Sequence, residues 1–145
     1  MTPWSSRYFI YTAYPTDGTR GYELGAQHGF FVFLNKKLGF KIIKKPLKRI
    51  VTRNVDNKPI IIEKGNMDVE ITIDAVHNIT KYDIAVFFTG DSDFLSLVTY
   101  IRSSEKKVHV FSSRHNISSE LRTGSNGYID ILKIEEDIWR NKFEK

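Results

Sequence analysis

The sequence predicts an α/β fold with a mainly parallel central sheet, and the stretch from Ile84 to Arg102 gives the clearest evidence for it. Ile84–Phe88 is a run of five apolar residues, which is typical of a strand covered on both faces within a parallel sheet. Gly90 then breaks the strand. After it, apolar residues recur at the spacing of an amphipathic helix that packs back on the sheet: Phe94, Leu97, Val98 and Ile101.

The segments before this stretch alternate between strand-like and helix-like patterns. In order, they predict a strand over Tyr8–Tyr14, a loop over residues 16–21, a helix over Glu23–Leu38, a strand over Phe40–Leu47 and a hairpin that pairs Ile50–Arg53 with Pro59–Glu63. Pro15 and Pro46 end the two strands, because proline cannot donate a hydrogen bond to a neighbouring strand. Gly39 is placed to stop the helix. We expect the hairpin to be an excursion from the sheet.

The segments on either side of residue 84 continue the same alternation to the end of the chain. In order, they predict a helix over Met67–Ile79 with Asn66 as its N-cap, the strand Ile84–Phe88, a helix from Phe94 to Arg102, a strand over Lys107–Phe111, a short helix over Ile117–Arg122, a strand over Tyr128–Ile134 and a helix over Glu135–Phe143. Strands and helices thus take turns along most of the chain, as they do in α/β proteins.

Length and composition limit the kinds of protein that this chain can be. Its 145 residues are enough for one domain with a buried core, so we expect a single domain over residues 1–145. No apolar run approaches the roughly 20 residues that a membrane span needs, and the chain shows no secretory leader. We therefore expect a cytoplasmic protein with no membrane partner. The absence of cysteine excludes disulfides, thiolate metal sites and cysteine nucleophiles.

Positive charge is concentrated in the first half of the chain. The formal net charge is +5, and the basic residues are densest at Lys36, Lys37, Lys41, Lys44, Lys45, Lys48, Arg49 and Arg53. Such a surplus suits a polyanionic partner such as nucleic acid. A solvated face of lysines explains the same pattern, so the composition leaves both interpretations open.

Two acids, Asp91 and Asp93, come directly after the predicted central strand and just before the next helix. Open α/β sheets place their ligand sites at this end of their strands. One acid has a simpler explanation, because Ser92 or Asp93 alone would cap the helix. Two carboxylates this close repel each other unless a positive group lies between them, and a divalent ion is the usual solution. Asp91 is therefore the stronger ligand candidate, whereas capping competes for Asp93.

A third acid, Asp68, lies on the inward edge of the helix predicted over Met67–Ile79. It precedes Ile71 by three residues, on the apolar stripe of that helix. Asp74 lies six residues after Asp68, which is about 120° further round the helix, so the two acids do not both face one ion. Asp68 is the better ligand candidate, and we expect Asp74 to support the site indirectly or to have a structural role.

Other catalytic chemistries lack their motifs in this sequence. The four histidines show no metal-ligand spacing; they are His28, His77, His109 and His115. No phosphate-binding loop of the Walker type and no nucleophile elbow occurs. Nucleotide-driven and serine-hydrolase functions therefore lose their main support.

Several of these stretches together resemble the NYN domain family, and within it the LabA-like branch, which shares the PIN-like nuclease fold. They are Lys64–Ala75, Tyr82–Phe94, Ser119–Arg122 and Tyr128–Asp130. The similarity in order and spacing runs from about Tyr8 to about Leu132. Its most specific part surrounds Asp91 and Asp93, followed by the lysine-glycine-x-x-aspartate stretch that ends at Asp68.

This resemblance implies a three-layer α/β/α sandwich of the PIN-like type, in which clustered acids hold Mg²⁺ or Mn²⁺ for hydrolysis of RNA phosphodiester bonds. The positions that correspond to the family's acidic metal site are Asp68, Asp91 and Asp93, and those that correspond to its supporting residues are Asp74, Thr89 and Ser92. The resemblance therefore supplies an activity for the acids that the residue pattern singles out.

Two features of the family pattern are missing from this chain. Family members usually begin with a strand that carries an aspartate, whereas this chain starts at the position of the second strand, so we expect the first strand to be lacking. Near the end, Asn126 stands where relatives often have an acid, and we include it among the supporting residues. Because an open edge invites pairing, we expect either reordered strands or a homodimer whose second copy covers the edge.

The leading hypothesis is a metal-dependent ribonuclease in which Asp68, Asp91 and Asp93 hold the ion and carry the catalysis. Its RNA, single-stranded or structured, would follow a basic surface with little reading of base sequence. The residues assigned to that surface are Lys36, Lys37, Lys44, Lys45, Lys48, Arg49 and Lys64. The alternatives are a non-catalytic RNA-binding or regulatory module with an incomplete acidic site and, with less support, a metal-dependent phosphatase acting on a small phosphoester.

Overall fold

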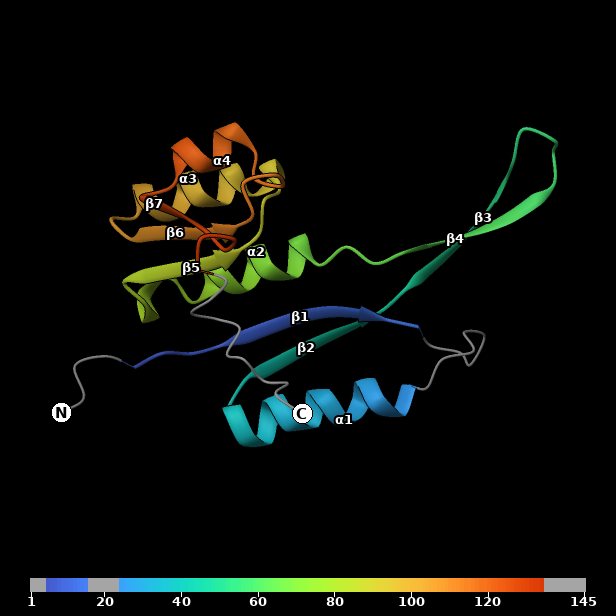
Figure 1. The fold of residues 1–145 in the computed structure, drawn as a ribbon, viewed down its shortest axis with the longest axis horizontal. Helices are drawn as coiled ribbons and strands as arrows, with labels where there is room; N and C mark the ends of the chain where they lie inside the picture. Colours follow the sequence, from blue (N-terminus) through green and yellow to red (C-terminus); the bar gives the residue numbers. More distant parts are fainter. Residues whose placement is uncertain (1–4, 16–23, 135–145) are drawn as a thin grey trace. The chain divides into compact units, whose positions relative to one another are not determined.

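The computed structural model describes residues 5–15 and 24–134, which form two compact units (Figure 1). The first unit is Met1–Ile71 and the second is Thr72–Lys145, so the boundary falls inside helix α2 (Asp68–His77). Three predictions lie wholly or partly outside the described residues. They are the loop over residues 16–21, the helix over Glu135–Phe143, and the first residue, Glu23, of the helix over Glu23–Leu38. The single domain over residues 1–145 stays a prediction.

The first unit is built on two parallel strands joined by a helix (Figure 1). Strand β1 (Phe9–Tyr14) pairs with β2 (Lys41–Pro46), and α1 (Leu24–Leu38) connects them. The helix ends at Gly39, whose φ of +72° lies in the left-handed region that glycine adopts without strain. Gly39 thus stops the helix as the sequence predicted, and the crossover makes the strand pair parallel.

A hairpin follows directly, formed by β3 (Lys48–Arg53) and β4 (Pro59–Lys64) in antiparallel register. It was predicted, but it is longer than expected, because strand β3 already begins at Lys48. Charged residues at its base lower the local strand signal, yet Lys48 pairs with Lys64 and Arg49 with Glu63 in the ladder. The pairing between strands therefore extends the hairpin beyond its apolar segments.

The second unit contains a three-stranded parallel sheet with the order β5-β6-β7, covered by helices on one face (Figure 1). Its elements are η1 (Ile79–Lys81), β5 (Ile84–Phe88), η2 (Ser92–Phe94), α3 (Leu95–Ser103), β6 (Lys107–Ser112), α4 (Ser119–Gly124) and β7 (Gly127–Asp130). Its core is formed by fully buried apolar side chains: Val98, Ile101, Val108, Val110 and Leu121. The core therefore sits between β6 and the pair of helices α3 and α4, as the helical spacing after Phe94 indicated.

Strand β5 is less buried than its sequence suggested. Ile84, Val86 and Phe88 are 41%, 48% and 76% exposed, whereas the alternate residues Ala85 and Phe87 are half-buried. The prediction that this run is covered on both faces is therefore wrong for one face. The physical reason is that successive side chains of a strand point to opposite faces of the sheet, and in β5 only the face that carries Ala85 and Phe87 is packed.

The last described strand and the helix before it also differ in extent from the predictions. Helix α4 begins two residues later than expected, because the Ser118 side chain accepts the backbone N–H of Leu121 and caps it. Strand β7 ends at Asp130 rather than at Ile134, because Asp130 turns the chain by accepting the N–H of Leu132. Within residues 5–15 and 24–134, no helix is long and apolar enough to cross a membrane.

Candidate metal centre

The acidic turn after β5 is held by hydrogen bonds of its own residues. The backbone N–H of Asp91 donates to Thr89 Oγ1, with 3.2 Å between the atoms, and Asp91 Oδ1 accepts the backbone N–H of Asp93 at 3.0 Å. Asp91 is therefore the N-cap of η2, a role that the sequence argument gave to Ser92 or Asp93. Both acids are exposed. A carboxylate has two oxygens, so capping by one leaves Asp91 able to bind a cation with the other.

Gly90 is needed for the chain to enter this turn. A Cβ atom at position 90 would clash with the backbone carbonyl of Asn116 and would lie 2.9 Å from Ser112 Oγ. The Gly90 carbonyl also accepts the backbone N–H of Ser118, at 3.0 Å. The loop after β6 is thus packed directly against the residue that precedes Asp91, and it fixes the path of the turn.

Asp68 is presented by the first turn of α2. Its backbone N–H donates to Asn66 Oδ1, at 2.7 Å, so Asn66 caps the helix as its sequence position predicted. The preceding residue, Met67, is buried and its carbonyl accepts the N–H of Ile71. The Asp68 side chain itself is half-buried. The cap and the buried methionine together set the direction in which the carboxylate leaves the helix.

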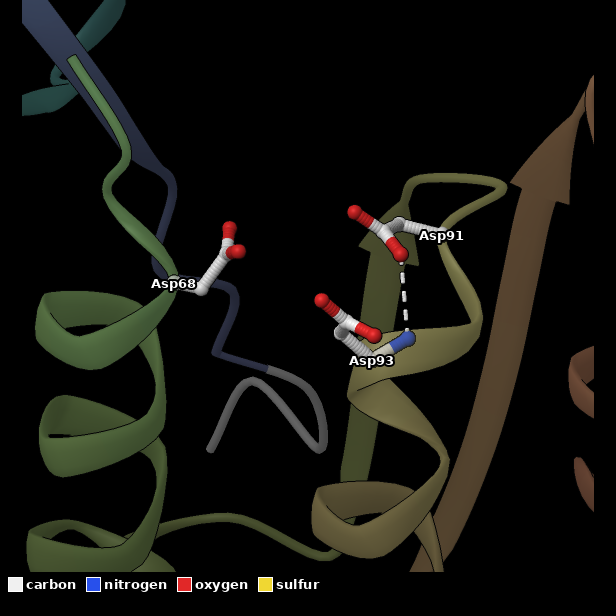
Figure 2. Close-up of side chains that lie close together, drawn as sticks. All are labelled: Asp68, Asp91 and Asp93. Carbon is white, nitrogen blue, oxygen red and sulfur yellow. Dashed lines mark hydrogen bonds between the residues drawn. The ribbon is translucent and has the colours of Figure 1, made fainter. Parts of the chain in front are cut away.

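The side chains of Asp68, Asp91 and Asp93 come together in one cluster (Figure 2). Each offers one carboxylate oxygen, and these oxygens all lie within 4.8 Å of one another. Figure 2 shows the three carboxylates directed toward a common space, Asp68 from α2 and the other two from the turn after β5. Asp74 is not a member of this cluster, which agrees with the rotation expected along the helix.

The donor atoms of the cluster fit a hard divalent cation. Mg²⁺ and Mn²⁺ prefer carboxylate and water oxygens, and cysteine and histidine ligands are absent from the cluster. Two oxygens on opposite sides of a Mg²⁺ ion are about 4 Å apart, which is close to the span of the three aspartates. Three carboxylates at these separations also repel one another, and a cation between them removes that repulsion.

The remaining predicted supporting residues take different positions. Thr89 contacts Asp91 directly, as described above, and Ser92 lies exposed within the acidic turn. Asn126 lies elsewhere: its Oδ1 accepts the N–H of Val108, at 2.8 Å, and its own N–H donates to the Val108 carbonyl. Val108 is at the amino end of β6, whereas the acidic turn follows the carboxyl end of β5, so the structure does not bring Asn126 to the cluster.

The basic residues assigned to RNA binding divide into two groups. Those that are exposed are Lys36, Lys37, Lys44, Lys48, Arg49 and Lys64. Arg49 also forms an ion pair with Glu63, with Nε and Oε1 3.3 Å apart. Lys45 differs, because its side chain is partly buried and its Nζ lies 2.7 Å from Oε1 of Glu70. Lys45 is therefore engaged with the protein itself.

Sequence reasoning missed two acids that have structural roles. Glu70 pairs with Lys45, and the hydrogen bond from Lys45 holds the pKa of the Glu70 carboxyl below its ordinary value. Asp130 is buried, and its Oδ1 accepts the backbone N–H groups of Arg114 and Leu132. An acid inside the apolar run from Tyr128 was a usable signal for Asp130. Nothing local marked Glu70, because its partner is 25 residues away.

Comparison with protein families identifies one match that covers most of the chain. The family described as NYN domain matches residues 6–132. This range includes all members of the aspartate cluster and every residue of the predicted basic surface.

Two similar proteins extend this comparison. The low amplitude and bright protein LabA of Synechococcus elongatus is 32% identical over 101 residues, which is 70% of this chain and 53% of that protein. The chain thus spans about half the length of this curated relative. A crystal structure of a protein of unknown function from Vibrio parahaemolyticus RIMD 2210633 is 26% identical, with a TM-score of 0.64 over 86% of this chain and 68% of that one.

Proposed function

Because the chain belongs to the NYN domain family, we propose that it is a metal-dependent ribonuclease that hydrolyses RNA phosphodiester bonds. The observation that carries this proposal is the convergence of Asp68, Asp91 and Asp93 within 4.8 Å. Asp68 comes from a different helix than Asp91 and Asp93, and the three carboxylates repel one another, so their convergence is costly without a cation. The family resemblance, which implies an acidic nuclease site at the same positions, agrees with this interpretation.

In the proposed mechanism, Asp68, Asp91 and Asp93 would hold Mg²⁺ or Mn²⁺. Such an ion would supply a Lewis acid for activation of water and for charge neutralisation at the scissile phosphate. The chain's own contribution is to orient the carboxylates before substrate arrives: Thr89 and the Asp93 backbone fix Asp91, and Asn66 fixes the turn of Asp68. Pre-oriented ligands lose less entropy on binding, which favours metal affinity and catalysis.

The RNA would be bound through its phosphates by the exposed basic residues of the first unit. These are Lys36, Lys37, Lys44, Lys48, Arg49 and Lys64. Contacts of this kind neutralise phosphate charge and carry little information about base sequence. We therefore propose that single-stranded or structured RNA binds with a strong dependence on salt and a weak dependence on sequence.

The finer description of the fold is also part of this proposal. It comprises a single domain over residues 1–145 with the three-layer, PIN-like arrangement of the family. Support comes from the parallel pairing of β1 with β2 and of β5, β6 and β7, which is the strand direction that such a fold requires.

The proposed activity is tested by incubating single-stranded RNA with the protein and Mn²⁺ or Mg²⁺. We expect the unmodified protein to cleave RNA, Asp91→Asn to lose most of that cleavage, and EDTA to abolish it. Asp56→Asn is the matched control, because Asp56 is an exposed acid in the hairpin turn and should keep full activity. Equal cleavage by the unmodified protein and Asp91→Asn would contradict the proposal.

A non-catalytic RNA-binding or regulatory module is the second candidate. It is favoured by Asn126, which stands where relatives often have an acid and which bonds to the backbone of Val108 instead of joining the aspartates. The acidic set is then incomplete. RNA binding that is as tight in EDTA as in Mn²⁺, without cleavage in either condition, would establish this candidate, whereas metal-dependent turnover would exclude it.

We further propose that the chain forms a homodimer. The described residues offer one apolar surface for this contact. Val51 and Ile61 are paired across the hairpin and are 70% and 63% exposed. An isolated two-stranded hairpin with such a surface gains stability when a second chain covers it. Sedimentation equilibrium that gives only the monomer mass at all accessible concentrations would refute the dimer.

A further inference from the structure

Lys45 of strand β2 reaches the beginning of α2 and binds it at two points. Its Nζ donates to Oε1 of Glu70, at 2.7 Å, and to the backbone carbonyl of Asn66, at 2.9 Å. Both contacts lie within the first unit. A single ammonium group therefore joins the residue before the helix to a residue of its first turn.

These two partners lie on either side of Asp68 in the sequence. The side chain of Asn66 also accepts the backbone N–H of Asp68, at 2.7 Å. Lys45 therefore binds the backbone carbonyl of the same residue whose side chain caps the helix at Asp68. Glu70 follows Asp68 by two residues in the same helical turn. The backbone that presents the Asp68 carboxylate is thus restrained on both sides by the same lysine.

The environment of this ion pair makes Lys45 difficult to replace. The side chains of Lys45 and Glu70 are only 31% and 32% exposed, and Glu70 Oε2 is enclosed with no hydrogen-bond partner within the described residues. Without Lys45, a partly buried carboxylate would lose its counter-ion, which costs more than the loss of an exposed pair. Glu70 would then turn toward water and release the first turn of α2.

The segment just before α2 has little room to adjust in another way. A Cβ atom at Gly65 would clash with the side chains of Ala13 and Leu47. Ala13 lies in β1, and Leu47 directly follows β2. The chain therefore passes close against the parallel strand pair before it enters the helix. This close passage and the Lys45 contacts together define where α2 starts.

We propose that Lys45 is a positioning residue of the aspartate cluster, which fixes the helical turn that presents Asp68. This inference rests on the proposed metal site, and it replaces the assignment of Lys45 as an RNA-phosphate contact. The ammonium group acts through Asn66 and Glu70 and does not itself touch the ion or the RNA. Loss of such supporting interactions typically lowers metal affinity by about 10-fold to 100-fold.

The test measures Mn²⁺ affinity of the full chain by electron paramagnetic resonance of the free ion. We expect Lys45→Met, which keeps most of the aliphatic stem, to weaken Mn²⁺ binding by about 10-fold. Lys45→Arg should recover most of the affinity, because it restores a cation that can reach both acceptors. Lys41→Met is the matched control: Lys41 lies on the same strand, is exposed, and places its Nζ 5.9 Å from the Phe9 ring centre. It should leave Mn²⁺ affinity unchanged.

A second measurement follows the apo protein, so that it does not depend on metal. Hydrogen exchange of the Asp68 backbone amide should be faster in Lys45→Met than in the unmodified protein or in Lys41→Met. Two results would overturn the inference. One is a lower melting temperature with unchanged Mn²⁺ affinity, which marks a purely structural pair. The other is weaker RNA binding in EDTA with unchanged Mn²⁺ affinity, which marks a phosphate contact.

RNA cleavage by the same variants separates this inference from the proposed function. If Lys45→Met weakens Mn²⁺ binding but neither the unmodified protein nor any variant cleaves RNA, the ribonuclease proposal fails and the positioning role stands. If the unmodified protein cleaves RNA and Lys45→Met binds Mn²⁺ normally, the positioning role fails and the ribonuclease stands. If Asp91→Asn binds Mn²⁺ as tightly as the unmodified protein does, the cluster is not the metal site, and both the positioning role and the ribonuclease proposal fail.

Discussion

The Asp91 carboxylate accepts the backbone N–H of Asp93, with 3.0 Å between Oδ1 and the nitrogen. This hydrogen bond explains why two acids stand two residues apart at the end of β5. Asp91 caps the helical turn that carries Asp93, and this hydrogen bond orients the Asp91 carboxylate as shown in Figure 2. Capping by one carboxylate oxygen therefore leaves the other oxygen of Asp91 available to the proposed metal site.

Substitutions of Asp91 should separate these two roles. Asp91→Asn keeps an oxygen that accepts the Asp93 N–H, so we expect the free energy of unfolding to stay within about 0.5 kcal/mol, because asparagine caps helices about as well as aspartate. Asp91→Ala loses the cap and should cost about 1 kcal/mol. Both should lose Mn²⁺ binding. Urea unfolding and Mn²⁺ titration of the two variants check this, and equal destabilisation by both would contradict the capping role.

Gly90→Ala should disturb the acidic turn, because the added methyl group would collide with the backbone of Asn116. We expect it to lower the free energy of unfolding by about 1–3 kcal/mol and to weaken Mn²⁺ binding. Gly29→Ala is the matched control: this glycine lies in α1 with nothing within 4 Å of a new Cβ, so alanine should stabilise the helix by about 0.5–1 kcal/mol. Urea unfolding measures both, and an unaffected Gly90→Ala would show that the turn adapts.

Tyr82 should make stability depend on pH in the alkaline range. Its hydroxyl donates to the Ala75 carbonyl of α2, at 2.9 Å, and burial raises its pKa above the ordinary value of 10.0. Below pH 10 the hydroxyl is neutral in both folded and unfolded chains, so this group adds no pH dependence. Above pH 10 the unfolded chain ionises first, and stability falls as pH rises through the folded pKa.

Tyr82→Phe should therefore reduce the alkaline loss of stability. At neutral pH it should cost about 1 kcal/mol, which is the usual contribution of one hydrogen bond. Tyr8→Phe, at a ring that is 52% exposed, is the matched control and should have little effect at neutral pH. Urea unfolding between pH 8 and pH 11 measures the slope, and an unchanged slope for Tyr82→Phe would refute the assignment.

Salt dependence of RNA binding should report the phosphate contacts of the basic surface. Lys36 and Lys37 are exposed at the carboxyl end of α1. Replacing both lysines with alanine should reduce the magnitude of the slope of log affinity against log salt by about 1.4, because each contact to single-stranded RNA contributes about 0.7. Lys133→Ala, at an exposed position outside the proposed surface, should leave the slope unchanged. Binding in EDTA at several salt concentrations gives the slopes, and no change in the double variant would remove these lysines from the surface.

Metal addition should stabilise the folded protein through the aspartate cluster. At a Mn²⁺ concentration 100 times the dissociation constant, the free energy of unfolding should rise by about 2.7 kcal/mol. Asp68→Asn should lose most of this gain, whereas Asp56→Asn should retain it. Thermal unfolding with and without Mn²⁺ measures the effect. The same gain in Asp68→Asn would show that Mn²⁺ binds elsewhere.

The sequence by itself determined the local elements and the family. Apolar spacing predicted α3 and its partner strands, Gly39 marked the end of α1, and Asn66 was recognised as the cap of α2. The resemblance carried by the stretches around Asp68 and Asp91 is confirmed by the family match over residues 6–132. These features follow from short-range rules of helix periodicity, capping and backbone conformation, which act between residues a few positions apart.

Only the tertiary structure decided which distant residues meet. Lys45 looked like one more exposed lysine until its contact with Glu70, 25 residues later, became visible. Asn126 was predicted to support the acidic site, but its hydrogen bonds with Val108 place it at the amino end of β6. The outer face of β5 proved exposed because its burial depends on which strands and helices pack beside it. Such contacts depend on how the elements pack, and no local pattern encodes that choice.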